Sequence, residues 1–429
     1  MNRREKSEKI LFYRREHKIF VKNKKRKKKK RNLKRKRTKL VAFLKRKGFV
    51  KRCQCRQNRK NKIEIPKDFS LIQNPDESIE VLRKLFYLGI NSKSNKLYIE
   101  HDRVKNLDIC ASTIMDVLIM EIEKIKKNQK QDFSILGHVK CEKKIMDILE
   151  VSGILKHLGI IDCDYKPDYI QKLELIECGA PDVVSTKVTD YINLCLNEQG
   201  FEFTREGKFN FSEMIGEVID NCKLHGGRFS KWYTLGHFTM EDDIGECQLV
   251  VFNFGESIYD NLKNGETSSE TRKSLEKITQ YYKNKFSRQS WNEEALWTLY
   301  SLQDGVSRLR DIKNPDRGTG TATFIDLFQK IGNTIDNNTP LMSVTSGKVS
   351  ILFNDKYRIR NSNFDGEERK IIAFNKENDL YKLPDKRNIR ILKNKFPGTV
   401  ISMKFYLDKK YLVKIMEEDE NERNQSYSM

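Results

Sequence analysis

Apolar residues in the first half of the chain recur at spacings that predict alternating strands and helices. Residues 96–104 and 133–139 form short apolar runs typical of strands, whereas residues 111–128 and 143–155 carry apolar side chains at helical spacing. Strands that alternate with helices over such distances favour a mixed or parallel sheet with helices packed on it. We therefore expect residues 63–165 to form a small α/β domain.

A second patterned region follows a stretch that reads as a linker or connecting strand, residues 166–184. A helix near residues 184–200 opens this region, and a domain is expected to run over residues 185–412, followed by a polar tail over residues 413–429. Within this domain, four short segments combine a regular apolar pattern with polar or glycine residues: residues 211–227, 247–262, 316–332 and 396–407.

The first segment predicts a helix that ends at Gly226 and Gly227. Glu217 and Asn221 are four residues apart and share one face of it. An amide oxygen is a suitable ligand for Mg²⁺, and a carboxylate can orient and deprotonate water. The alternatives are structural: Asn221 bonded to backbone, and Glu217 facing solvent because glutamate favours helices.

The other three segments place glycine or hydroxyl residues where a strand or helix begins or ends. A buried-type strand runs into Asn253 and Gly255, and Thr399 enters a strand of alternating apolar residues. Between them, a glycine-rich turn opens directly into an apolar helix. Such a turn directs backbone N–H groups and a helix N-terminus at an anion. The turn and its helix contribute four candidate ligand residues: Arg317, Gly318, Gly320 and Thr321.

Taken in this order, the four segments resemble the N, G1, G2 and G3 boxes of the GHKL superfamily, which includes gyrase-type ATPases, histidine kinases and anti-sigma-factor kinases. The resemblance covers about residues 185–410, roughly half of the chain. It implies a Bergerat-type ATP-binding domain, an α/β (α+β) sandwich in which ATP and Mg²⁺ lie between a mixed sheet and helices, beneath a mobile lid.

The resemblance also implies roles for individual residues. Asn221 corresponds to the Mg²⁺ ligand and Glu217 to the water-activating glutamate of gyrase-type members. Asn253 stands where the family has an aspartate that accepts from the adenine amino group, and Ser257 stands where it has a second glycine; both departures predict weaker or altered nucleotide selectivity. The remaining correspondences are Gly255 in the adenine-side turn, Gly318 and Gly320 in the phosphate loop, and Thr399 as the hydroxyl near adenine; Arg317 is a further candidate for phosphate contact.

The first domain resembles a STAS-like domain in its order of strand, helix, strand and a helix ending in LEVSGIL. It lacks the Asp-Ser-Ser/Thr phosphoacceptor signature of that family. Ser112 and Thr113 lie near the corresponding helix start, where an N-cap role is the favoured interpretation. The resemblance implies a protein partner for this domain.

Charge separates the N-terminus from the rest of the chain. Residues 1–62 hold 30 Lys and Arg against 3 Asp and Glu, whereas the remaining residues hold 53 against 57. We expect a basic, disordered arm over residues 1–62. It is either simply solvated or makes sequence-independent contact with nucleic acid, and the absence of aromatic residues from positions 22–39 argues against base readout.

Cysteine usage and hydropathy limit the cellular setting. Nine scattered cysteines without a framework spacing are typical of reduced thiols, and Cys53 and Cys55 lack a nearby second pair of zinc ligands. No run approaches the ~20 apolar residues of a membrane span, and no apolar region follows the charged N-terminus as in a secretory signal. A cytoplasmic protein is expected.

Three functions remain open from the sequence. The first is an ATP-driven conformational switch, with or without slow ATP hydrolysis, in which ATP orders the long interval at residues 257–316 as a lid. The second is an anti-sigma-type serine/threonine protein kinase or regulator, and the third is a non-catalytic nucleotide-binding scaffold. The sequence leaves the oligomeric state open.

Overall fold

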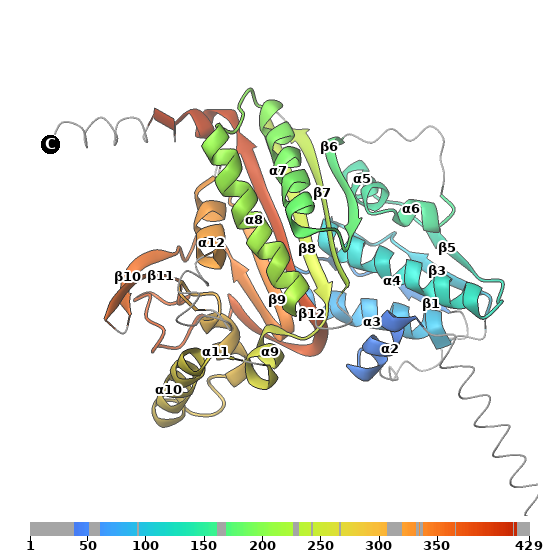
Figure 1. Cartoon of the computed structure of the whole chain (residues 1–429). Coiled ribbons are helices and arrows are strands. Elements are labelled where there is room, and N and C mark those ends of the chain that lie inside the picture. Colours follow the sequence, from blue (N-terminus) through green and yellow to red (C-terminus); the bar gives the residue numbers. More distant parts are fainter. Residues whose placement is uncertain are drawn as a thin grey trace, which may run out of the picture.

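A five-stranded antiparallel sheet forms the centre of the molecule (Figure 1). The computed structural model describes residues 38–50, 61–91, 94–160, 169–225, 231–241, 243–265, 267–306, 320–331, 334, 338–364, 366–414 and 416–417. In spatial order the strands are β6 (Tyr169–Glu177), β7 (Lys231–Glu241), β8 (Ile244–Phe254), β12 (Ile389–Asp408) and β9 (Leu341–Phe353).

Three helices cover one face of this sheet: α7 (Pro181–Asn197), α8 (Arg205–His225) and α12 (Gly320–Ile331). Figure 1 shows α7 and α8 side by side across the strands. The buried residues of α8 include Ile215, Val218 and Ile219, which follow the helical spacing of the sequence. The helix ends directly before Gly226, as predicted.

The N-terminal residues form a second α/β layer. Strands β1 (Lys62–Glu64), β3 (Lys96–Glu100) and β5 (Ser134–His138) make a parallel sheet, which confirms the predicted strand arrangement. Two further short strands, β2 (Asp68–Phe69) and β4 (Asn106–Leu107), pair beside it. The helices of this unit are α3 (Pro75–Asn91), α4 (Ile109–Asn128), α5 (Lys143–Val151) and α6 (Ile154–His157).

Two details of this unit differ from the sequence predictions. The helix expected at residues 143–155 is divided into α5 and α6 by Gly153, whose φ of 88° interrupts helical geometry. The N-cap of α4 is Asp108, whose side chain accepts from the N–H of Ala111, so neither Ser112 nor Thr113 has that role. Ser112 is fully buried instead, with its hydroxyl 2.6 Å from that of Ser152.

The two predicted domains share one sheet. Along β8, Val250, Phe252 and Phe254 face the N-terminal unit, whereas the alternate residues Leu249 and Val251 face the helices. The apolar core of the N-terminal unit therefore continues into the far face of the five-stranded sheet. The expected linker at residues 166–184 contains β6, which pairs with β7, and the start of α7; both belong to the second unit.

Part of the segment expected to be a disordered arm is folded. Residues 39–46 form helix α2 (Lys39–Arg46), whose Leu40, Val41, Phe43 and Leu44 are buried in the N-terminal unit. The expectation of a disordered arm over all of residues 1–62 is therefore wrong for α2 and β1. High charge density concealed an amphipathic pattern, because lysine and arginine can border an apolar helix face while remaining in water. Residues 1–37 and 51–60, with Cys53 and Cys55, are not among those described.

The described part of the long interval after β8 is largely helical. It contains α9 (Ile258–Asn264), α10 (Ser269–Lys285) and α11 (Glu293–Tyr300), and Trp297 joins α11 to α10 through a 2.8 Å hydrogen bond from Nε1 to the Thr279 hydroxyl. A hairpin of β10 (Arg360–Phe364) and β11 (Glu367–Ile371) lies at the edge of the molecule (Figure 1).

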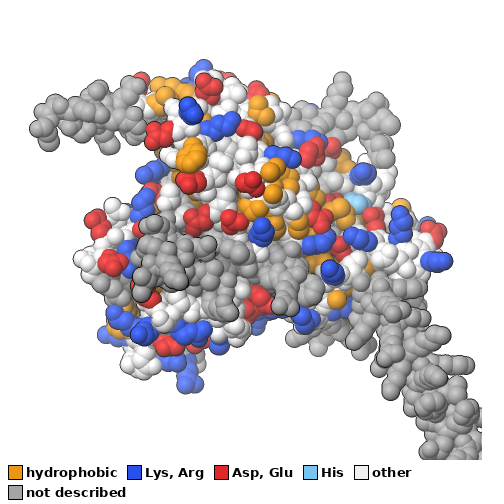
Figure 2. All heavy atoms as spheres, in the orientation of Figure 1, with side chains coloured by type: hydrophobic (Ala, Val, Ile, Leu, Met, Phe, Trp, Pro, Cys, Tyr) orange, Lys and Arg blue, Asp and Glu red, His pale blue; other side chains and the backbone are white. Residues whose placement is uncertain are grey.

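The described surface carries mixed charge. Figure 2 shows Lys and Arg interspersed with Asp and Glu over the visible face, as expected for a body whose charges nearly balance. Within the described ranges, no helix has the length and apolar character to cross a bilayer.

Candidate nucleotide site

A central cavity of about 120 Å³ lies where α8, α9 and α12 meet strands β8, β9 and β12. Residues from all four of the sequence segments line it: Glu217, Asn221, Asn253, Thr321 and Thr399. These residues span positions 217 to 399 of the chain, so only the fold brings them together. At least one residue named from each segment therefore lies at the same cavity.

The cavity has an apolar wall and a polar end. Strands β9 and β12 contribute Met342, Val344 and Ile401, and helices contribute Leu262 and Phe324. An apolar pocket with a few convergent polar groups is the usual form of a small-molecule site. The enclosed volume is below the ~300–1,000 Å³ typical of such sites, so a ligand of nucleotide size would extend beyond it.

At the polar end, the carboxylate of Glu217 lies against the first residue of α12. A Cβ atom placed on Gly320 would be 1.6 Å from Oε2 of Glu217, so only glycine allows this approach. The N-terminus of a helix carries partial positive charge and favours an anion. In this structure the group at the helix start is the carboxyl group of Glu217.

Asn253 is fully buried and joins three elements of the site. Its amide nitrogen donates to the backbone oxygen of Cys222 on α8, at 2.5 Å, and its amide oxygen accepts from the N–H of Thr399 on β12, at 2.8 Å. These two partners determine the orientation of the amide, because one requires a donor and the other an acceptor. An aspartate here would place an oxygen against the Cys222 carbonyl, which gives a structural reason for asparagine.

Thr399 also makes a side-chain contact at the cavity. Its hydroxyl lies 2.8 Å from that of Ser346 on β9, and the Ser346 hydroxyl accepts from the N–H of Ile258 at 2.9 Å. Ile258 is the first residue of α9 and lines the cavity. The hydroxyl pair therefore connects both strands to the helix that follows β8.

The two glycine-related expectations near β8 have different outcomes. Gly255 donates its N–H to Pro397 at 3.0 Å and is not among the cavity-lining residues, so it serves the β8–β12 junction. The position that requires glycine is instead Gly398, on the facing strand. Its φ is 146°, and a Cβ atom there would lie 2.0 Å from the backbone oxygen of Asn253. Ser257 caps α9 by accepting from the N–H of Asp260 at 3.1 Å, which explains a serine at that position.

Several predicted residues cannot be placed. Arg317 and Gly318 fall outside the described ranges. Conversely, the sequence did not indicate Asn261 and Ser301, two polar residues that line the cavity. Their positions follow from how α9 and α11 pack on β9, for which the sequence carries no local signal.

The described lining has little charge. Glu217 and Cys222 are its only ionisable side chains, and burial raises the pKa of the Cys222 thiol to about 12. Within the described part of the chain, no group of three or more His, Cys, Asp or Glu residues is arranged to hold a metal ion. A cation here would need most of its ligands from a bound molecule.

No protein-family model, curated protein or solved structure matches this chain.

Proposed function

We propose that the central cavity binds Mg-ATP and that the protein is a Bergerat-type, ATP-driven conformational switch. One observation carries the proposal: four segments separated in sequence, each with the residue types of a nucleotide site, line a single cavity between helices and a sheet. The N-terminal unit, with its parallel sheet and packed helices, is proposed to be STAS-like and to address a protein partner.

The residues present are compatible with the nucleotide. The apolar wall suits a nucleotide base, and Asn253 and Thr399 offer polar atoms beside that wall. The amide oxygen of Asn253 has two lone pairs, and the N–H of Thr399 occupies only one of them, so the other is available to a ligand. The helix start at Gly320 is compatible with phosphate, because a carboxylate already lies there. Asn221 offers an oxygen to Mg²⁺, and phosphate oxygens and water would complete the coordination.

The reaction supported best is slow hydrolysis. Mg-ATP would supply the phosphoanhydride bond that hydrolysis breaks and a metal ion that neutralises the charge of the phosphates. Glu217 lies at the polar end of the cavity, where it can orient a water and accept its proton. As a kinase, the protein would need a substrate other than its own Ser112, which is buried. As a scaffold, it would bind nucleotide with the same residues and release no phosphate.

Calorimetric titration of Mg-ATP into the full chain tests this proposal. Asn221→Ala is expected to weaken binding at least ten-fold, while Asp220→Ala, an exposed neighbour on the same helix, is the matched control and leaves it unchanged. A phosphate-release assay then separates an ATPase from a scaffold. Wild-type affinity in Asn221→Ala would mean that the nucleotide binds elsewhere.

A further inference from the structure

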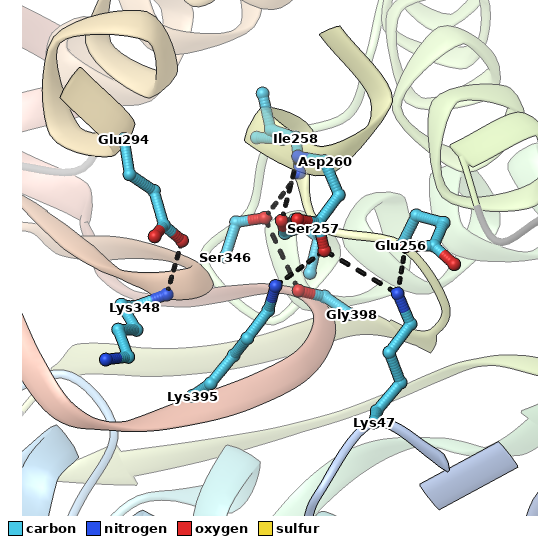
Figure 3. A network of polar contacts seen from close by, with 11 residues as sticks. Lys47, Glu256, Ser257, Ile258, Asp260, Glu294, Ser346, Lys348, Lys395 and Gly398 are labelled. Atoms are coloured by element: carbon cyan, nitrogen blue, oxygen red, sulfur yellow. Dashed lines mark hydrogen bonds and ion pairs between the residues drawn. The ribbon is translucent and has the colours of Figure 1, made fainter. Parts of the chain in front are cut away.

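A network of polar contacts connects the basic N-terminal segment to the wall of the central cavity (Figure 3). Its members are Lys47, Glu256, Ser257, Asp260, Ser346 and Lys395, together with the backbone of Ile258. Lys47 follows α2, and the carboxylates border the first turn of α9. Residues more than 200 positions apart in sequence therefore meet beside the proposed nucleotide site.

The segment that carries Lys47 is firmly seated. Leu40, Val41 and Leu44 of α2 are almost completely buried, and Phe49 packs against Phe86 of α3 with ring centroids 6.3 Å apart. Burial of apolar side chains is the main favourable contribution to folding, so this packing holds the helix in place. Residues 38–50, which we call the strap, thus have a fixed position against the N-terminal unit.

Lys47 extends from the strap to both carboxylates. Its ammonium pairs with Glu256 and lies 3.6 Å from Asp260, which Lys395 also contacts at 2.6 Å. The side chains of Lys47 and Asp260 are only 19% and 17% exposed, so solvent screens them less than a surface pair. Burial alone would raise the pKa of Asp260, but the hydrogen bond from Lys395 and the charges of both lysines hold the pKa below its usual range.

The carboxylates in turn position the cavity wall. Asp260 lies in the first turn of α9, and Ile258, Asn261 and Leu262 of that helix line the cavity. On its other side, α9 is held by the Ser346 hydroxyl, which also contacts Thr399. Loss of the Lys47 contacts would leave Glu256 without this ion pair and Asp260 with Lys395 alone, so the start of this short helix would be held less firmly.

We propose that Lys47 is a positioning residue of the central cavity, and that through it the strap controls nucleotide binding. This rests on the proposed function. The strap carries four cationic residues, Lys39, Lys45, Arg46 and Lys47, which suit the phosphodiester backbone of nucleic acid. Phosphates bound along the strap compete with Glu256 and Asp260 for Lys47. The start of α9 then loosens, so nucleic acid and nucleotide weaken one another's binding, as linkage requires.

Hydrogen exchange tests the positioning role without any ligand. In Lys47→Met, the amides of α9 are expected to exchange faster than in wild type, whereas Lys47→Arg restores protection. Lys39→Met is the matched control, because Lys39 is an exposed lysine of the strap, at the first residue of α2. Unchanged exchange at α9 in Lys47→Met would overturn the positioning role, and equal effects of Lys47→Met and Lys39→Met would show a general charge effect only.

Coupled titrations test the regulation. Affinity for a fluorescent 20-nucleotide oligo(dT) is measured with and without saturating Mg-ATP, and Mg-ATP affinity with and without oligo(dT). Wild type is expected to show an equal weakening of about five-fold or more in both directions, near the lower end of typical couplings. Lys47→Met is expected to reduce the coupling to near unity while both ligands still bind. Intact coupling in Lys47→Met, or tight oligo(dT) binding with no coupling in wild type, would overturn the proposal.

The two proposals fail in different ways. If wild type binds no Mg-ATP, the proposed function is wrong, yet faster exchange at α9 in Lys47→Met would still establish the mechanical link. If Mg-ATP binds and Asn221→Ala abolishes binding, but Lys47→Met changes neither exchange nor coupling, the proposed function stands and the role of Lys47 is refuted.

Discussion

The two faces of the five-stranded sheet are packed differently. On the face toward the N-terminal unit, aromatic side chains fill the space: Tyr233 stacks on Phe252 at 4.9 Å and Phe254 on Phe396 at 5.8 Å. On the opposite face, alternate residues of the same strands, Asn253 and Thr399 among them, border a cavity.

This difference shows how one strand can serve stability and binding at once. Successive side chains of a strand point to opposite faces, so β8 contributes Phe252 and Phe254 to a close-packed core and Asn253 to the cavity. Close packing maximises dispersion contacts, whereas a ligand site requires that packing be left incomplete. Substitutions on the first face should therefore reduce stability, and those on the second should mainly affect the ligand.

The largest effect is expected from Phe252→Ala. Phe252 is fully buried among aromatic rings, so truncation should lower the free energy of unfolding by about 3–5 kcal/mol. Ile401→Ala on the cavity side is the comparison, with a loss expected to be less than half as large because one side of Ile401 is already open. Urea denaturation measures both. Equal losses would show that the two faces do not differ in packing.

The second-largest effect is expected from acid, which should lower the stability of the folded protein through His237 on the packed face. Burial, the largest influence, lowers the pKa of His237 to about 4 despite the nearby Glu246 carboxylate, whereas an unfolded histidine titrates near 6.5. The unfolded chain therefore binds a proton that the folded chain refuses, so stability falls as pH drops from about 6.5 to 4, by about 3 kcal/mol.

Replacing the histidine checks this assignment. His237→Leu should remove about half of the pH dependence in that window, because burial also lowers the pKa of His101 to about 4. Thermal unfolding measured at half-unit pH intervals gives the slope. An unchanged slope in His237→Leu would mean that His237 does not remain neutral in the folded protein.

On the cavity side, Asn253→Asp should lower the stability of the folded protein and should not strengthen Mg-ATP binding. The new carboxylate would face the Cys222 carbonyl oxygen, at a cost of about 1–3 kcal/mol. The loss should diminish at low pH as the carboxyl group becomes protonated and can donate. Thermal unfolding and Mg-ATP titration measure the two effects. Unaltered stability with tighter binding would show that Asn253 serves the ligand first.

The smallest effect on stability is expected from Glu217→Gln. Removing this charge from the N-terminus of α12 should cost about 0.3–1 kcal/mol of stability, and it should strengthen nucleotide binding by about two- to five-fold because phosphate no longer competes with a carboxylate. Phosphate release should fall sharply. Calorimetry with ADP and with adenosine separates the effects, since adenosine carries no phosphate and its affinity should not change.

Much of the fold was predictable because its signals are local. Helical spacing indicated α4 and α8, and short apolar runs indicated β3, β5 and β8. Helix α3 was missed, although its apolar residues also recur at helical spacing, and α2 was hidden among lysines. Of the candidate site residues named from the sequence, five line the cavity, whereas Gly255 belongs to a strand junction; Asn261 and Ser301 line the cavity but were not indicated by the sequence.

The amino-acid sequence alone determined which segments become strands and helices and which residue types stand at their ends, because both depend on neighbours a few positions away. Only the tertiary structure decided that the N-terminal unit covers the second face of the sheet, that Asn253 is held by Cys222 and Thr399, and that Lys47 meets Asp260. An apolar run indicates that a face will be buried but not which element will cover it. Contacts between residues 200 positions apart produce no periodic pattern in the sequence.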